Sequence, residues 1–132
     1  MRGDMKQKIF FAAVCGLIGM LTACGSLQNQ VRIEGREAIV PMTASDFKFQ
    51  PNNIATRTGE TITFRIQNTS GTTHNFTLKE PDGTTIRNVD IPPGQSVDVT
   101  VTFSKAGTYP FDCNKTGHAT LGMKGQVVAT GE

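Results

Sequence analysis

The chain contains few residues of the kinds that usually carry chemistry. Its 132 residues include two His, three Cys, one Tyr and no Trp. Two imidazoles leave few candidates for general acid–base catalysis, which relies most often on His. The uncharged run from Ile9 to Leu21 is shorter than the roughly 20 residues that a membrane-spanning helix needs. The length suits one ordinary domain, so any chemistry must come from very few side chains.

The net charge of +2 belongs to the amino end of the chain. Residues 1–23 carry three of the 13 basic and one of the 11 acidic side chains, which leaves ten of each in the remaining 109 residues. A neutral domain lacks the basic face that neutralises phosphates, and this argues against nucleic-acid binding.

The first 23 residues have the pattern of a cleaved leader. Arg2, Lys6 and Lys8 precede the apolar run, which is followed by the small residues Thr22 and Ala23. A basic segment, a short apolar run and small residues at the junction are typical of a secretory signal. We therefore expect residues 1–23 to be a signal peptide.

The junction Leu21-Thr22-Ala23-Cys24 resembles the lipobox of bacterial lipoproteins, in which the Cys is lipid-modified and becomes the first mature residue. This implies an exported protein, on the periplasmic or cell-surface side, anchored to the membrane through Cys24, with ordinary secretion as the alternative. Residues 24–35 are mostly polar, so we expect a lipidated Cys and a flexible tether. With Cys15 in the leader and Cys24 lipidated, Cys113 is the one thiol left in the domain, and no internal disulfide can form.

Residues 36–132 have the period-two pattern of short β-strands. Ile62, Phe64 and Ile66 alternate with polar residues, as do the apolar residues of 96–103. Weaker copies of the pattern occur at residues 38–44, 47–49, 74–79, 89–91, 108–113 and 125–130, with turn signals between them. Seven or eight short strands without a helical period indicate an all-β, antiparallel sandwich or barrel. We expect a single monomeric domain.

Near the carboxyl end, Cys113, His118 and Met123 have the spacing C-x4-H-x4-M. Alternation along the two strands concerned turns both Cys113 and His74 toward the core. Taken singly, each of these residues is more often a packed core residue than a ligand. Together they offer two imidazoles, a thiolate and a thioether, which is the ligand set of blue copper. Zinc prefers four firm donors and has little use for a thioether.

At these residues the sequence resembles the cupredoxins, the small blue copper proteins that include plastocyanin, azurin and auracyanin. The similar segments, in chain order, are Phe47-Lys48-Phe49-Gln50-Pro51, Thr58-Gly59-Glu60, His74-Asn75-Phe76, Pro93-Gly94-Gln95-Ser96, residues 107–113, Gly117-His118 and Gly122-Met123-Lys124-Gly125. The resemblance implies an eight-stranded Greek-key β-sandwich that holds one mononuclear type 1 copper ion. It assigns His74, Cys113 and His118 as equatorial ligands and Met123 as the axial ligand.

The resemblance also implies roles for residues around the ligands. Asn75 matches the Asn that ties the two ligand loops of cupredoxins together, by bonding to the backbone near Asn114. The backbone N–H groups after Cys113 are expected to donate to its sulfur. The carbonyl of Thr73 is a candidate for a remote axial group.

His118, on the loop, is expected to be the ligand nearest solvent and the port for electrons. Around it, Ala119, Leu121 and Gly122 form a small apolar surface suited to transient docking. The expected partners are redox proteins such as a cytochrome or a copper or haem oxidoreductase. We therefore predict a membrane-tethered copper protein that is not an enzyme and transfers single electrons between Cu(I) and Cu(II).

Other functions use parts of the same pattern. A periplasmic copper carrier or chaperone, which delivers copper to an oxidase or reductase, would use every ligand named above. A multicopper oxidase domain would carry a His-x-His pair, and a dinuclear copper site would need a second Cys in the ligand loop; neither is present. A thiol nucleophile is disfavoured because the thiolate of Cys113 would face the core.

Overall fold

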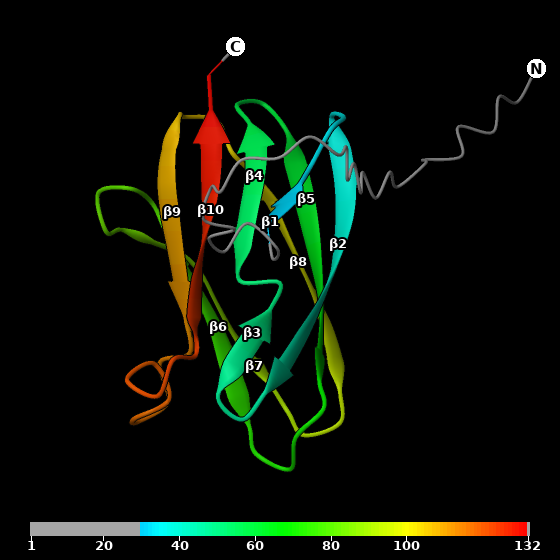
Figure 1. Ribbon diagram of the computed structural model, residues 1–132, viewed down its shortest axis with the longest axis vertical. Coiled ribbons are helices and arrows are strands. Elements are labelled where there is room, and N and C mark those ends of the chain that lie inside the picture. Colours follow the sequence, from blue (N-terminus) through cyan, green and yellow to red (C-terminus); the bar gives the residue numbers. More distant parts are fainter. Residues whose placement is uncertain (1–29, 132) are drawn as a thin grey trace, which may run out of the picture.

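A computed structural model of the protein describes residues 30–131. Ten β-strands in these residues form the two sheets of a sandwich (Figure 1). In chain order they are β1 (Gln30–Arg32), β2 (Glu37–Ser45), β3 (Lys48–Gln50), β4 (Asn53–Arg57), β5 (Thr61–Asn68), β6 (His74–Lys79), β7 (Thr85–Ile91), β8 (Ser96–Thr102), β9 (Gly107–Asp112) and β10 (Lys124–Thr130). Within residues 30–131, no helix has the length and apolar character needed to cross a membrane.

The larger sheet has the strand order β1-β4-β10-β9-β6-β7, and the smaller has the order β3-β2-β5-β8. This confirms the predicted all-β sandwich. The expectation of purely antiparallel sheets is wrong, because β1 with β4, β4 with β10, and β2 with β5 pair in parallel. Between β2 and β5 the chain crosses to the other sheet through β4, and such a long connection allows the return strand to run in the same direction.

The sequence prediction missed β1 and β4. In β4 the inward pair Ile54 and Thr56 includes a polar residue, so the alternation is weak. All three side chains of β1 are exposed, and this strand is held by its backbone pairing with β4. Ile33, just after β1, is 8% exposed, so the predicted domain boundary at residue 36 lies inside the fold. The predicted signal peptide and Cys24 lie outside the described residues.

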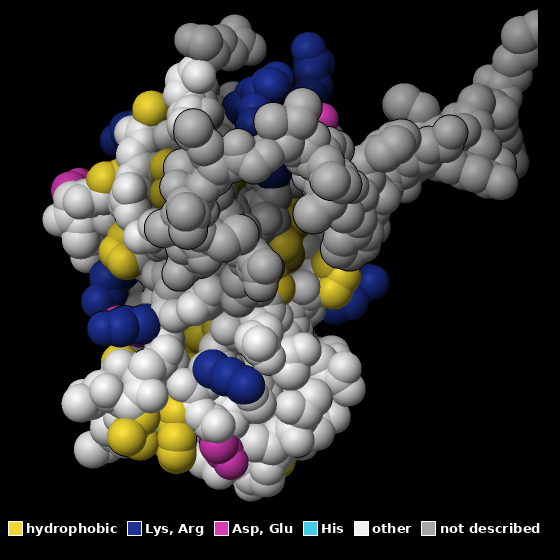
Figure 2. All heavy atoms as spheres, viewed as in Figure 1, with side chains coloured by type: hydrophobic (Ala, Val, Ile, Leu, Met, Phe, Trp, Pro, Cys, Tyr) yellow, Lys and Arg dark blue, Asp and Glu magenta, His cyan; other side chains and the backbone are white. Residues whose placement is uncertain are grey.

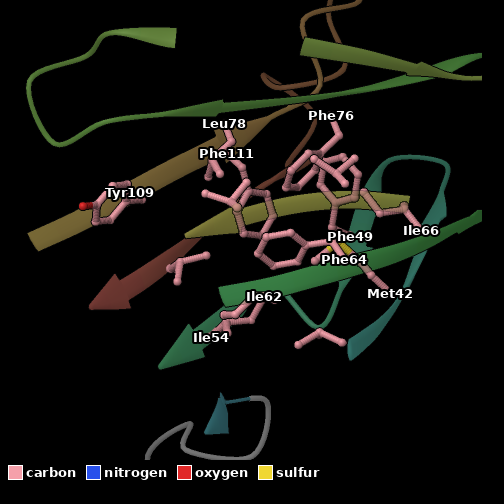
Figure 3. Close-up of a cluster of buried hydrophobic side chains, with 14 of the residues drawn as sticks. Met42, Phe49, Ile54, Ile62, Phe64, Ile66, Phe76, Leu78, Tyr109 and Phe111 are labelled. Carbon is pink, nitrogen blue, oxygen red and sulfur yellow. The ribbon is translucent and has the colours of Figure 1, made fainter. Parts of the chain in front are cut away.

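Aromatic side chains fill the space between the sheets (Figure 3). Phe76 on β6 and Phe111 on β9 pack with ring centroids 5.1 Å apart, and Phe49 meets both rings edge to face. Such pairs contribute about 0.5–1.5 kcal/mol each beyond the area they bury. Phe76 lies two residues after His74, and Phe111 two residues before Cys113. The core therefore fixes the two strands that present these predicted ligands.

The pairing of β9 with β10 depends on Gly125, which lies opposite Phe111 in the register. A Cβ atom at position 125 would overlap both the Phe111 ring and the carbonyl oxygen of Asn52. Glycine is needed here because backbone and ring approach too closely for any side chain. This close approach lies two residues from Met123 and keeps the start of β10 against β9.

Candidate metal centre

The four predicted ligands come from strand ends and one loop at the same end of the sandwich. His74 begins β6, Cys113 directly follows β9, Met123 directly precedes β10, and His118 lies in the loop between β9 and β10. In Figure 1 this loop (orange) lies at the lower end of the molecule, away from the C-terminus. Because β6 and β9 are neighbours in the larger sheet, His74 and Cys113 meet there.

The donor atoms of three predicted ligands form a compact cluster. His74 Nδ1 lies 3.3 Å from His118 Nδ1, which in turn lies 3.4 Å from Cys113 Sγ. The potential ligand atoms of all three residues lie within 4.8 Å of one another. One metal ion among them could contact two imidazole nitrogens and one sulfur.

Met123 is attached to this cluster through its backbone. Its N–H donates to the carbonyl of His118 at 3.1 Å, and its carbonyl accepts the N–H of Cys113 at 3.0 Å. Its side chain is fully buried. The role of Met123 as an axial ligand stays a prediction, as does that of the carbonyl of Thr73.

Of the four predicted ligands, His118 is the most exposed. It is partly exposed, whereas the side chains of His74 and Cys113 are fully buried. The Phe47 ring packs edge-on against the His118 ring, with centroids 4.8 Å apart. Of the predicted docking residues, Leu121 is 62% exposed, Gly122 is exposed and Ala119 is half-buried. Figure 2 shows hydrophobic side chains (yellow) gathered at the lower end, near the loop between β9 and β10.

The hydrogen bonds of His74 identify which ring nitrogen faces the cluster. Its Nε2 lies 2.8 Å from Ser70 Oγ and 3.1 Å from Asp46 Oδ1. The Asp46 carboxylate can only accept, and Ser70 donates its own proton to Asn68 Oδ1 at 2.9 Å. Nε2 therefore carries the proton. The lone pair of Nδ1 faces the cluster that His74 forms with His118 and Cys113.

The surroundings of the His74 imidazole favour its neutral form. Burial lowers its pKa, the Asp46 carboxylate opposes that shift, and His118 adds to it, so the pKa lies below its ordinary value. A neutral imidazole is the form that binds a metal.

The sulfur of Cys113 accepts a hydrogen bond from the backbone N–H of Asn75 at 3.3 Å. The family resemblance predicts donors to this sulfur among the residues after Cys113. Instead, the N–H of Asn114 is directed at the Asn75 side-chain oxygen at 3.5 Å. That contact joins Asn75 to the ligand loop at Asn114, the residue near which the resemblance implies such a link.

Asn75 is the centre of a wider network. Its side-chain nitrogen donates to Asn88 Oδ1 at 2.6 Å and to Asp90 Oδ1 at 3.1 Å, and its oxygen accepts the hydroxyl of Thr77. Asp90 also pairs with Lys115 of the ligand loop, with Nζ 2.9 Å from Oδ1. The network fastens the loop to β6 and β7.

Three further residues of this site, Asp46, Phe47 and Ser70, were not predicted from the sequence. They lie in the β2–β3 and β5–β6 connections, which have no recognisable spacing to the ligands. Only the pairing of β2 with β5 brings these connections to the same end of the sandwich. No local signal in the sequence could have found them.

The chemistry of the donor set fits copper. Imidazole nitrogens suit Cu(II), and a thiolate with a nearby thioether suits Cu(I), so both oxidation states find acceptable ligands. Among residues 30–131, the cluster offers three His or Cys donors, one fewer than the four firm N, S or O ligands of structural zinc.

Comparisons with known proteins agree with this chemistry. Residues 13–129 match the family model of the cupredoxin-like domain. Chloroplastic plastocyanin of Hordeum vulgare is 31% identical over 134 residues, which span 96% of this chain and 79% of the relative. Plastocyanin of Daucus carota is 35% identical over 88 residues, which span 62% of this chain and 87% of the relative.

Solved structures share the fold at lower identity. Auracyanin A, a "blue" copper protein from Chloroflexus aurantiacus, has a TM-score of 0.63 and 22% identity over 71% of this chain and 99% of its own. Reduced rusticyanin has a TM-score of 0.62 and 21% identity over 78% of this chain and 85% of its own.

Proposed function

Because the chain belongs to the cupredoxin-like domain family, we propose that it holds one type 1 copper ion and carries single electrons between redox proteins. The observation that carries this proposal is the gathering of His74, Cys113 and His118, with their donor atoms within 4.8 Å, at one end of the sandwich. Copper supplies one-electron chemistry when bound, by alternating between Cu(II) and Cu(I).

The ligands we assign are His74 Nδ1, Cys113 Sγ and His118 Nδ1, with the thioether of Met123 as a weak axial donor. The protonated Nε2 of His74 supports the use of its Nδ1. The hydrogen bond from Asn75 to the sulfur favours the thiolate form of Cys113, because it stabilises negative charge.

The contacts of the described residues would hold the ligands in place through a change of oxidation state. His74 and Cys113 lie at the ends of two paired strands and are fully buried. The loop that bears His118 is tied back at Asn75 and through the Lys115–Asp90 ion pair. A preorganised site of this kind moves little when an electron arrives or leaves, and this favours rapid transfer.

His118 is the proposed port for electrons. It is the most exposed of the assigned ligands, and exposed apolar surface from Leu121 and Phe47 lies beside it. Such a small surface suits brief contact with a redox protein, such as a cytochrome or a copper or haem oxidoreductase. Because the mature domain has no net charge, docking should depend only weakly on salt.

We further propose that the protein is exported and anchored to a membrane by a lipid on Cys24. This rests on the sequence of residues 1–24 alone. Expression of the full chain in a bacterial host should place it in the membrane fraction, and Cys24→Ala should release it. Equal partition of both forms into the soluble fraction would contradict the anchor.

The test of the copper site is addition of Cu(II) to the mature protein. An intense visible absorption band and an EPR signal with narrow copper hyperfine splitting are expected, because a copper–thiolate bond produces both. Cys113→Ser should abolish the colour and leave the β-sheet circular dichroism unchanged. Binding of copper without either signature would refute the type 1 assignment.

A further inference from the structure

The turn between β2 and β3 contacts both histidines of the metal centre through consecutive residues. Asp46 Oδ1 lies 3.1 Å from Nε2 of His74, and the Phe47 ring packs edge-on against His118. This turn supplies none of the ligands assigned above, yet it lies against the outer side of the cluster.

We propose that Asp46 is a positioning residue of the copper centre, which holds His74 with Nδ1 toward the metal and lowers the reduction potential. The proposal rests on the copper function proposed above. A carboxylate that accepts a hydrogen bond from a ligating imidazole fixes its tautomer and orientation and raises its basicity. The more basic ligand and the nearby negative charge both favour Cu(II) over Cu(I).

Ser70 is a second acceptor at Nε2. Comparison with Ser70 distinguishes the two effects of Asp46, which are the orientation of the His74 ring and the supply of negative charge. Ser70 lies closer, at 2.8 Å, but is neutral, and its hydroxyl also interacts with Asn68 and the Thr72 carbonyl. Ser70 alone could hold the ring only as a neutral acceptor. The charge that tunes the potential must therefore come from Asp46, the one carboxylate recorded in contact with the His74 ring among the described residues.

The first test compares the reduction potential of the copper-loaded protein with those of Asp46→Asn and Asp82→Asn. Each variant removes one negative charge and keeps a side chain of the same shape. Asp82 caps the turn before β7 by accepting the N–H of Thr84 at 2.9 Å. That turn packs beside Gly107, at the end of β9 away from Cys113.

Asp46→Asn should shift the Cu(I)/Cu(II) ratio at a fixed applied potential about tenfold toward Cu(I), which is about 59 mV in a one-electron couple. Asp82→Asn should leave the potential unchanged. An unchanged potential in Asp46→Asn would overturn the proposal, and so would equal shifts in both variants.

The second test uses the metal-free protein, so it does not depend on copper. Nitrogen-15 NMR at pH 7 should show His74 as the Nε2–H tautomer, and Asp46→Ala should reduce the population of that tautomer while circular dichroism stays unchanged. The same tautomer population in both proteins would show that Ser70 suffices and would overturn the positioning role. If the tautomer responds to Asp46→Ala but the unaltered protein gives no type 1 copper signal, the copper function fails while the Asp46–His74 contact stands.

Discussion

The backbone N–H of Cys113 donates to the carbonyl of Met123 at 3.0 Å, where the chain enters and leaves the ligand loop. The N–H of Met123 in turn donates to the carbonyl of His118 at 3.1 Å. The residues assigned as thiolate, imidazole and thioether ligands are therefore joined by main-chain bonds that need no metal. Their side chains can be changed without opening the loop.

Met123→Leu should keep the colour of the copper-loaded protein and raise its reduction potential. Leucine retains the volume of methionine, so the fully buried site should lose less than about 1.5 kcal/mol in free energy of unfolding. Although a thioether is compatible with Cu(I), three equatorial ligands already satisfy Cu(I), whereas the more highly charged Cu(II) gains more from a fourth donor. Removal of the thioether therefore destabilises Cu(II) more, and the potential rises. Voltammetry measures the shift; an unchanged potential would exclude Met123 as the axial ligand.

Asn75→Ala should lower the free energy of unfolding by about 1–3 kcal/mol, because it leaves buried partners such as Thr77 without their hydrogen bonds. Urea unfolding of the metal-free protein measures the change. Asn88→Ala is the matched control: Asn88 is exposed and provides a single recorded contact to Asn75. Equal losses in the two variants would contradict the central place of Asn75 in the network.

Glu60 fastens the β4–β5 turn at the far end of the sandwich from the metal centre. Its side chain is 7% exposed and accepts bonds from the Thr56 hydroxyl at 2.6 Å, the Arg57 N–H at 2.8 Å and the Gly35 N–H at 3.3 Å. Burial alone would raise the pKa of Glu60, but these hydrogen bonds outweigh it and lower the pKa below its ordinary value.

A lowered pKa in the folded state means that the Glu60 carboxylate stabilises the fold above its unfolded pKa of about 4.3, and that this contribution is lost as the pH falls through the folded value. Glu60→Gln should therefore cost about 1–3 kcal/mol at pH 7, and the cost should become smaller as the pH falls below about 4.3. Urea unfolding between pH 7 and pH 3 measures both proteins. A cost that stays constant over this range would contradict the account.

Leu121→Asp should slow electron self-exchange between two copies of the copper-loaded protein by about tenfold or more, because it places like charges across the proposed docking surface. The rate is measured from NMR line broadening in mixtures of oxidised and reduced protein. Ile39→Asp, at an exposed site on the early part of β2, is the control and should leave the rate unchanged. Equal rates in Leu121→Asp and the unaltered protein would exclude this surface as the docking site.

Much of the fold could be predicted because half-buried strands show alternation in the sequence. Ile62, Phe64 and Ile66 point inward on β5 as expected, and all are fully buried. The alternation fails for β1, whose side chains are all exposed, since main-chain pairing alone defines that strand. Parallel pairing could not be predicted either, because it depends on where the chain crosses between sheets.

The metal centre, like the fold, could be predicted only in part from the sequence. His74, Cys113 and His118 could be found because they are the domain's only imidazoles and thiol, and their spacing matches a known family. The contact of Asp46 with His74 could not, because it joins the β2–β3 connection to the first residue of β6, and the sequence carries no local signal for that approach. The hydrogen bond from the Asn75 N–H to the Cys113 sulfur was not predicted, because these residues lie far apart in the sequence and the pairing of β6 with β9 brings them together.

The central claim is that this centre carries electrons, and cyclic voltammetry of the copper-loaded mature protein in the presence of a copper(I) chelator tests it most directly. The account predicts a reversible one-electron wave that persists through repeated cycles, with copper retained in both oxidation states. Loss of the wave as the chelator removes Cu(I) after the first reduction would contradict electron transfer and support copper delivery instead.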